Sequence, residues 1–240
     1  MKKLVSAENV CLAYPSAHRG MRGLFSKAPP MPLALNDISF DLKTGERLAL
    51  IGLNGSGKST LLRTIAGIYP PKSGSMNVSG SLVALFNLGV GMRMDLSGRK
   101  NIILQGLANG QALDQITELV PDIIDFSELE AVIDDPIHTY SQGMAMRLSF
   151  SIATALEPEI LLLDEWIGAG DRVFKIKAQA RVEAMVQDSS GLILASHNTN
   201  IVRRYCTKAI WLNTGKIVAK GDVDTVLSAF EEGTSGQNGS

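Results

Sequence analysis

The chain has 240 residues, of which 45% are hydrophobic, enough to bury the core of one compact domain. Its formal net charge of -1 excludes a global field that would draw the protein to nucleic acid or to an anionic membrane, so any anion site must be local. The sequence contains only two cysteines, which provide neither a disulfide framework nor a zinc spacing and so favour a reducing, cytoplasmic compartment.

The first residues, MKKLVSAENV, lack the apolar run of a signal peptide. No segment of the sequence contains the roughly 18 apolar residues of a membrane-spanning helix. We therefore expect that a partner carries this protein to any membrane at which it works.

The next segment, residues 16–32, is basic and has no acidic residue. Its basic and apolar side chains are interleaved: His18, Arg19, Met21, Arg22, Leu24, Phe25 and Lys27. A short basic amphipathic element of this kind suits a membrane surface or a lipid-linked pyrophosphate. A mobile, solvated loop explains the same residues equally well. The prolines of APPMP end any helix here, and LALNDISFDL is expected to follow as a strand.

Short apolar runs bounded by turn residues predict buried parallel strands at 47–52, 159–165 and 191–197. Helical patterns between them complete an α/β alternation. Residues 92–156 differ because their apolar residues recur at helical spacing with little strand signal, which predicts a mostly helical lobe inserted into the α/β core. The run AIWLNTGKIVAKGD, residues 209–222, predicts a hairpin that turns at Asn-Thr-Gly.

These patterns give approximate domain bounds. The predicted α/β core comprises residues 1–91 and 157–228, and the helical lobe comprises residues 92–156. The last residues, GTSGQNGS, are rich in Gly, Ser and Asn, and residues 229–240 are predicted to form a flexible tail.

The segment from Gly52 to Ser59 fits the pattern G-x-x-x-x-G-K-[ST], between a predicted strand and a predicted helix start. Its glycines let successive N–H groups point at phosphate oxygens, while the helix N-terminus and Lys58 add positive charge. Ser59 is expected to bind Mg²⁺, and Thr60 can cap a phosphate. A glycine-rich turn without a ligand is the alternative, which the strand, lysine and hydroxyl together disfavour. The predicted phosphate-binding residues are Asn54, Gly55, Ser56, Gly57, Lys58, Ser59 and Thr60.

Polar residues follow two of the predicted strands. Asp164 ends ILLLD, at the edge where open α/β sheets place ligands, and can hold the Mg²⁺ shell through water. Glu165 is better placed as a general base that polarises an attacking water. His197 ends GLILASH and could donate a hydrogen bond to a γ-phosphate or fix that water. Taken alone, the acidic pair is an ordinary solvated strand end and the histidine a structural one.

A second candidate anion site lies far downstream, at Ser141-Gln142-Gly143-Met144, which opens the predicted helix AMRLSFSIATAL. Ser141 can act as N-cap, and the small Gly143 leaves the helix N-terminus accessible to an anion. Alone, this pattern indicates no more than a capped helix.

YSQGM, ILLLDE, GAGD and SH follow one another in an order that resembles the signature, Walker B, D-loop and H-loop series of ABC transporter ATPases. The resemblance extends over nearly the whole chain. It implies an α/β fold, namely a P-loop NTPase core with a mixed sheet and an inserted α-helical subdomain. It also implies ATP and Mg²⁺ as ligands. In that family, two copies meet head to tail and enclose each ATP between the phosphate loop of one and the signature helix of the other.

The resemblance assigns further roles residue by residue. Ser141, Gln142 and Gly143 would contact the nucleotide bound to a second copy. Asp171 in GAGD matches the D-loop aspartate that faces the partner copy, and Tyr14 in VCLAYP matches the aromatic residue that stacks on adenine. The sequence departs from the family pattern at the Q-loop, where the glutamine is missing and the shorter amide Asn87 is its nearest match. It also departs at Lys100, where the polysaccharide-export branch of the family usually has an acidic residue.

Three stretches resemble the polysaccharide-export branch of the family: YSQGMAMRLSFSIA, LFNLGVGM with LSGRKNI, and EWIGAGDRVFKIKA. They imply an ATPase subunit at the cytoplasmic face of the bacterial inner membrane, bound to a transmembrane permease that exports a lipid-linked glycan. Relatives carry an insertion comparable to residues 16–32, which favours the interface interpretation of that segment.

Other cargoes remain an alternative, namely those of importers or drug-efflux systems. A soluble ABC protein acting on DNA or ribosomes is disfavoured because the chain holds one cassette and has no nucleic-acid footprint. A non-hydrolysing scaffold is disfavoured because Glu165 and His197 are both present. Since the sequence ends soon after VDTVLSAFEEG, we expect no added sugar-binding domain in this subunit.

Overall fold

The computed structural model describes residues 1–14, 32–86, 88–89, 91–165 and 172–235. The chain divides into two compact units. The first comprises Met1–Gly80, Leu162–Glu165 and Ser190–Ser240, and the second comprises Ser81–Leu161 and Trp166–Ser189. Within the described ranges, no helix is long and apolar enough to cross a membrane.

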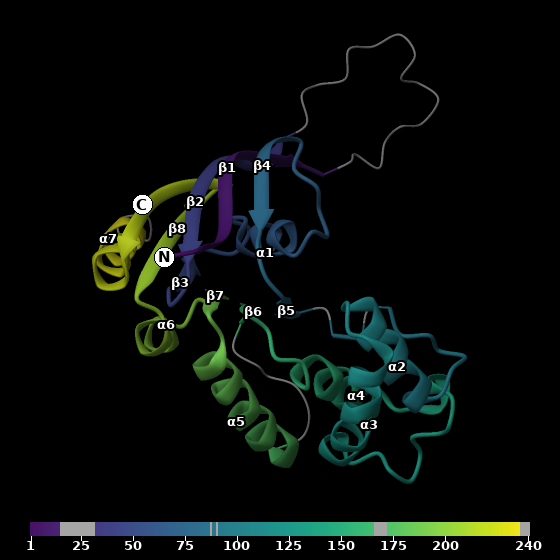
Figure 1. The fold of residues 1–240 in the computed structure, drawn as a ribbon. Coiled ribbons are helices and arrows are strands. Elements are labelled where there is room, and N and C mark those ends of the chain that lie inside the picture. The colour runs from purple at the N-terminus through teal and green to yellow at the C-terminus, as the bar shows by residue number, and fades with distance from the viewer. Residues whose placement is uncertain (15–31, 87, 90, 166–171, 236–240) are drawn as a thin grey trace, which may run out of the picture. The chain divides into compact units, whose positions relative to one another are not determined.

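The first unit contains a three-stranded antiparallel sheet in the order β2-β1-β4 (Figure 1). Its strands are β1 (Lys3–Ala13), β2 (Leu33–Lys43) and β4 (Ser73–Val78). Along β2, the side chains of Ile38, Phe40 and Leu42 are buried while the residues between them are less so. This period of two is the burial pattern of a sheet with one face on the core.

The larger sheet is mixed, as predicted, and has the order β5-β6-β7-β3-β8-β9. Strand β3 pairs in parallel with β7 and β8, whereas β8 and β9 are antiparallel. All five residues of β7 are buried, as expected for a parallel strand covered on both faces. The strand bounds are β3 Arg47–Ile51, β5 Leu82–Leu85, β6 Ile160–Asp164, β7 Gly191–Ala195, β8 Lys208–Asn213 and β9 Lys216–Asp222.

The described part of the first unit also contains three helices. They are α1 (Lys58–Ile65), α6 (Thr199–Tyr205) and α7 (Val223–Ser235). The prediction of a flexible tail at 229–240 is wrong for residues 229–235, because the chain stays helical through Ser235. Tertiary packing explains the difference: the ring of Phe230 meets that of Trp211 edge-on, with 5.6 Å between ring centroids. Residues 236–240 lie outside the described part of the chain.

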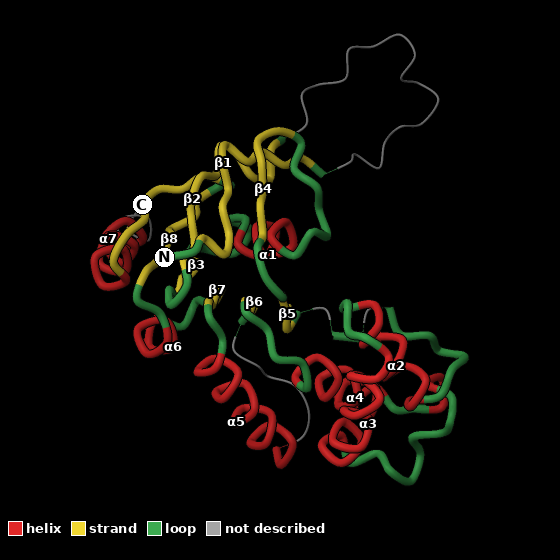
Figure 2. Tube along the Cα trace, in the orientation of Figure 1, coloured by secondary structure: helices red, strands yellow, loops and turns green. Residues whose placement is uncertain are grey.

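The second unit is mostly helical, which confirms the helical pattern read from residues 92–156 (Figure 2). Its helices are α2 (Gly98–Ala108), α3 (Leu113–Ser127), the 3₁₀ turn η2 (Ile137–Thr139), α4 (Gln142–Thr154) and α5 (Arg172–Asp188). A shared apolar core joins α2, α3 and α4 through Ile102, Ile116, Ile123, Leu148 and Ile152.

The predicted domain bounds differ from the observed units. Helix α5 was expected in the α/β core because it stands between two sheet strands, but it packs in the helical unit. Its Phe174 is buried, and its ring lies 5.8 Å from the rings of both Phe126 and Phe150 between centroids. This aromatic cluster draws 172–188 to α3 and α4, a long-range contact that local alternation does not reveal.

Candidate functional site

The loop between β3 and α1 has a backbone that only glycine adopts easily. Gly52, Gly55 and Gly57 have φ of 147°, 79° and 110°. A Cβ at Gly52 would also lie 2.2 Å from the carbonyl oxygen of Leu212. The glycine spacing in the sequence thus reflects both the backbone conformation and close packing.

The turn of the β8–β9 hairpin forms a hydrogen bond to this loop. The backbone N–H of Gly215 donates to the carbonyl oxygen of Ser56 at 2.9 Å, and the N–H of Asn36 donates to that of Gly215 at 2.8 Å. A Cβ at Gly215 would lie 2.5 Å from the carbonyl oxygen of Ala34. Sequence reasoning identified the hairpin but missed its contact with the loop, for which no local signal exists.

The loop forms one wall of a cavity of about 510 Å³, a volume that suits a small-molecule ligand. The cavity brings together most of the residues singled out in the sequence. Its lining consists of Tyr14, Ala34, Asn54, Gly55, Ser56, Gly57, Lys58, Ser59, Thr60, Asp164 and Glu165.

Lys58 begins α1 and is 8% exposed. Its Nζ donates to the carbonyl oxygens of Gly52 at 2.7 Å and Leu53 at 3.1 Å. Burial lowers the pKa of the Lys58 ammonium below its ordinary value, and the carboxylates of Glu165 and Asp164 oppose that decrease. The lysine therefore stands near the acidic pair with donors that an anion could share.

Ser56 is an unsatisfied group in the same loop. Its side chain is 4% exposed, and within the described residues its Oγ has no hydrogen-bond partner. A buried hydroxyl without a partner costs free energy unless a ligand or water satisfies it. A phosphate oxygen in the cavity would be such an acceptor.

The acidic residues lie at the end of β6, where Asp164 is the last residue of the strand and Glu165 follows it. Glu165 has a left-handed backbone, with φ of 67°, and its N–H donates to the carbonyl oxygen of Ala195 at 2.8 Å. Its Oε1 lies 2.9 Å from Nδ1 of His197, which comes two residues after β7. The structure thus brings Glu165 and His197 into direct contact, although His197 is not among the residues that line the cavity.

Tyr14 follows β1 directly and meets two residues associated with α1. Its hydroxyl is 2.7 Å from Oγ1 of Thr60, the third residue of the helix. Its ring meets Tyr69 edge-on, with 5.4 Å between ring centroids and an interplanar angle of 88°. Sequence analysis selected Tyr14 and Thr60 but not Tyr69, which belongs to no recognised motif.

Ser141 is the N-cap of α4 in the second unit. Its Oγ accepts a hydrogen bond from the backbone N–H of Met144 at 3.2 Å, which confirms the predicted cap. Gln142 and Gly143 form the first turn, and a Cβ at Gly143 would have only Ser141 Oγ near it, at 3.9 Å. Among the described residues, this helix start is therefore sterically open at Gly143.

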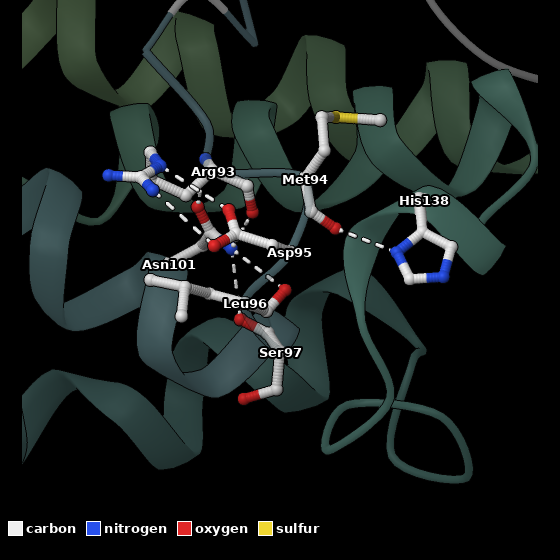
Figure 3. A network of polar contacts seen from close by, with 7 residues as sticks. All are labelled: Arg93, Met94, Asp95, Leu96, Ser97, Asn101 and His138. Atoms are coloured by element: carbon white, nitrogen blue, oxygen red, sulfur yellow. Dashed lines mark hydrogen bonds and ion pairs between the residues drawn. The ribbon is translucent and has the colours of Figure 1, made fainter.

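The side chain of Asn101 in α2 forms hydrogen bonds with the backbone of the loop that leads into α2 (Figure 3). It is fully buried, and its Oδ1 accepts from the N–H of Arg93 at 2.8 Å. Its Nδ2 donates to the carbonyl oxygens of Arg93 at 3.0 Å, Ser97 at 3.0 Å and Leu96 at 3.3 Å. Lys100, the departure noted in the sequence, is exposed beside it.

Three expectations lie outside the described residues: those for Asn87, for Asp171 and for the basic segment up to residue 31. They stay predictions.

A glycine loop between a strand and a helix, facing an acidic strand end on a mixed sheet, defines a P-loop NTPase. Comparison with known proteins identifies the family: the model for the ABC transporter family matches residues 35–168. The chain therefore belongs to the ABC transporter family.

Several curated relatives are similar over most of this chain. An O-antigen export system ATP-binding protein of Yersinia enterocolitica is 44% identical over 184 residues, 77% of each chain. An O-antigen export ATP-binding protein of Myxococcus xanthus is 39% identical over 84% of this chain and 46% of its own length. The teichoic acids export ATP-binding protein of Bacillus anthracis is 38% identical over 83% of this chain and 36% of its own length. The chain thus spans less than half the length of the last two relatives.

Solved structures of low identity share the fold. An ATP-binding subunit of an ABC transporter superimposes with a TM-score of 0.73 at 23% identity, covering 95% of this chain and 93% of its own. A dimeric ATP-binding cassette in a post-hydrolysis state, bound to ADP and phosphate, gives a TM-score of 0.68 at 20% identity, covering 91% of this chain and 98% of its own. These likenesses confirm the predicted fold class.

Proposed function

We propose that this chain is the ATP-hydrolysing subunit of an ABC transporter that exports a lipid-linked polysaccharide of the O-antigen, capsule or teichoic-acid type. It would act at the cytoplasmic face of the bacterial inner membrane, bound to a transmembrane permease. The observation that carries the ATPase part is the single cavity that gathers the phosphate loop, Asp164 and Glu165. The names of the relatives support the cargo, because they are O-antigen and teichoic acid export proteins.

The triphosphate would lie along the loop between β3 and α1. Backbone N–H groups and the start of α1 offer donors and a positive dipole end, while Lys58 adds a cation. To reach a phosphate oxygen, Lys58 exchanges its present bonds to the Gly52 and Leu53 carbonyls. The unpartnered Ser56 hydroxyl gains an acceptor at the same time.

The residues present fit a magnesium ion. Ser59 offers a hydroxyl and Asp164 a carboxylate in the same cavity, and Mg²⁺ prefers a few such oxygens together with phosphate and water. When bound, the ion supplies neutralisation of the charge that develops on the phosphates. Asp164 and Ser59 would orient it.

Hydrolysis requires a water in line with the γ-phosphate. Glu165 would accept the proton of that water, and His197 would hold the Glu165 carboxylate in place through the contact at 2.9 Å. Phosphoryl transfer depends mainly on positioning and on charge neutralisation, which these side chains provide.

A second copy of this chain would complete the site. Ser141, Gln142 and Gly143 of that copy present an open helix start, whose N–H groups and dipole suit the γ-phosphate. Asp171 would face the partner copy near the same nucleotide. Closing two copies around two ATP molecules would then drive the conformational change of the permease.

The test measures ATP hydrolysis by the purified subunit, alone and with its co-expressed membrane partner, with and without a lipid-pyrophosphate-linked glycan. Stimulation by both partner and glycan is expected. Hydrolysis that is indifferent to the glycan but stimulated by another cargo would replace the export proposal with an importer or a drug-efflux system.

Lys58→Ala provides the control for the ATPase part. It should weaken nucleotide binding about 10- to 100-fold, because a charge-assisted hydrogen bond contributes about 1.5–3 kcal/mol. If Lys58→Ala binds Mg·ATP as tightly as the wild type does, this cavity is not the nucleotide-binding site.

A further inference from the structure

Two residues contact Tyr14, one near the start of helix α1 and one beyond its end. Near its start, Oγ1 of Thr60 lies 2.7 Å from the Tyr14 hydroxyl. Beyond its end, the rings of Tyr69 and Tyr14 meet edge to face, with 5.4 Å between their centroids. The chain reaches Tyr69 through a tight turn, in which the N–H of Ile68 donates to the carbonyl oxygen of Arg63 at 2.9 Å. The same helix thus fixes both contacts.

The hydroxyl contact conflicts with the role expected for Thr60. Both Tyr14 and Thr60 line the cavity, and Thr60 is only 9% exposed. A hydroxyl carries one proton, so a Thr60 that donates to Tyr14 has none to donate to a phosphate. A Thr60 that accepts from Tyr14 instead keeps its own proton for a phosphate. In the arrangement in which Thr60 donates to Tyr14, the contact must therefore break before Thr60 donates to a phosphate.

The contact with Tyr69 has no such conflict. An edge-to-face pair leaves at least one face of the Tyr14 ring free of Tyr69, and it restricts the ring without involving the hydroxyl. A ring that is already restricted loses less conformational freedom when a planar base stacks on it. Tyr69 can therefore act on base binding without touching the nucleotide.

We propose that Thr60 donates its proton to the Tyr14 hydroxyl, a latch that holds until a triphosphate displaces it, and that Tyr69 is a positioning residue that holds the Tyr14 ring for the base. The proposal rests on the proposed nucleotide binding and adds an order to it. Phosphate arrives first at Thr60, the hydroxyl is released, and the ring, steadied by Tyr69, becomes the platform for adenine. Nucleotide binding then includes the cost of breaking one hydroxyl–hydroxyl hydrogen bond.

The test separates the phosphate part from the base part by using two probes. The affinity of the full chain is measured for Mg²⁺ with a non-hydrolysable ATP analogue and for Mg²⁺ with inorganic tripolyphosphate, which has no base. Tyr14→Phe keeps the ring but removes the latch, so both probes should bind about two- to tenfold more tightly, the worth of one hydrogen bond. Tyr14→Ala should bind tripolyphosphate more tightly and the ATP analogue more weakly.

Tyr69→Leu tests the positioning role. The ATP analogue should bind about three- to tenfold more weakly, the range of one aromatic pair, while tripolyphosphate should bind no more weakly than to the wild type. Tyr69→Phe keeps the edge contact and should restore the affinity for the analogue. Tyr205→Phe is the matched control for hydroxyl removal, because Tyr205 lies on α6 and does not line the cavity, and it should leave both affinities unchanged.

Two results would overturn the proposal. If Tyr14→Phe leaves both affinities unchanged, the latch does not exist. If Tyr69→Leu weakens both probes alike, Tyr69 supports the phosphate loop rather than the base platform. A wild-type protein that binds neither probe would overturn the proposed function itself, so the two failures are distinguishable.

Discussion

The carboxylate of Glu165 and the imidazole of His197 meet at 2.9 Å, at the ends of two neighbouring strands, β6 and β7. An ionised carboxylate can only accept a hydrogen bond, so the shared proton resides on Nδ1. The contact involves Oε1 of Glu165, so Oε2 would be the oxygen that accepts the proton of a water in the proposed hydrolysis. His197 thus orients the carboxylate of Glu165 in this structure, an interaction that the sequence analysis did not foresee when it directed the histidine at phosphate or water.

Replacing Glu165 tests the base directly. Glu165→Gln removes the carboxylate but keeps the shape, so turnover should fall about 10²- to 10⁴-fold while Mg·ATP still binds. Because hydrolysis no longer opens the site, two copies should remain together when ATP is present, which size-exclusion chromatography would detect. The exposed Glu130→Gln in the second unit is the control. Wild-type turnover by Glu165→Gln would exclude this base.

His197→Ala tests whether the pair acts as a unit. Alone, it should lower kcat with little change in KM, because the histidine orients Glu165 rather than binding nucleotide. Added to Glu165→Gln, it should cost little further activity, since residues that act together are strongly non-additive. Single-turnover hydrolysis by the four proteins of this cycle is the measurement, and independent, multiplying losses would contradict the pairing.

The phosphate loop could be predicted from the sequence because every part of it is local. The glycines, Lys58 and Ser59 occupy fixed positions between β3 and α1, and the structure has the φ angles that the glycines implied. The cap at Ser141 is predictable for the same reason, since its partner is the N–H three residues on.

The residues that the sequence analysis missed act across long separations. Gly215 supports the loop through a hydrogen bond to Ser56, and Phe174 draws α5 to a helix formed some fifty residues earlier, through Phe126. Tyr69, which comes after α1, contacts Tyr14, which comes after β1. A single sequence reveals such contacts only after folding brings the partners together, because none is specified by period or by motif.

The N-cap of α4 offers a test of the second copy's contribution. Ser141→Ala loses the cap and should destabilise the helix by about 1 kcal/mol while leaving nucleotide binding to a single copy unchanged. In the Glu165→Gln background, it should reduce the fraction of ATP-bound dimer. Ser97→Ala is a matched control, because Ser97 caps α2 in the same unit and accepts from the N–H of Lys100 at 3.3 Å. Equal loss of dimer in both variants would reduce Ser141 to a structural cap.

Asn101 should be a strong determinant of stability in the second unit. Asn101→Ala leaves the part-buried backbone groups of Arg93, Leu96 and Ser97 without their amide partner, which should cost about 1–3 kcal/mol of unfolding free energy (Figure 3). Urea unfolding measures the change. Asn109→Ala, an exposed asparagine with one local bond, should cost less than about 0.5 kcal/mol. Similar values for both variants would show that the network does not stabilise the fold.

The buried thiol of Cys206 gives the protein a defined alkaline sensitivity. Burial raises the pKa of Cys206 from its ordinary 9.0 to about 12, so above pH 9.0 the unfolded chain loses a proton that the folded chain keeps. Deprotonation then favours the unfolded state, and the stability present below pH 9.0 should fall by on the order of 1 kcal/mol per pH unit until about pH 12. Urea unfolding of wild type and Cys206→Ala at rising pH isolates this slope, because lysines and tyrosines titrate alike in both. A Cys206→Ala protein with the same alkaline slope as the wild type would show that the thiol titrates while folded.

Cys11, which is partly exposed, should react with iodoacetamide well before Cys206 does, because the attacking species is the thiolate and the Cys206 thiol is neutral and covered.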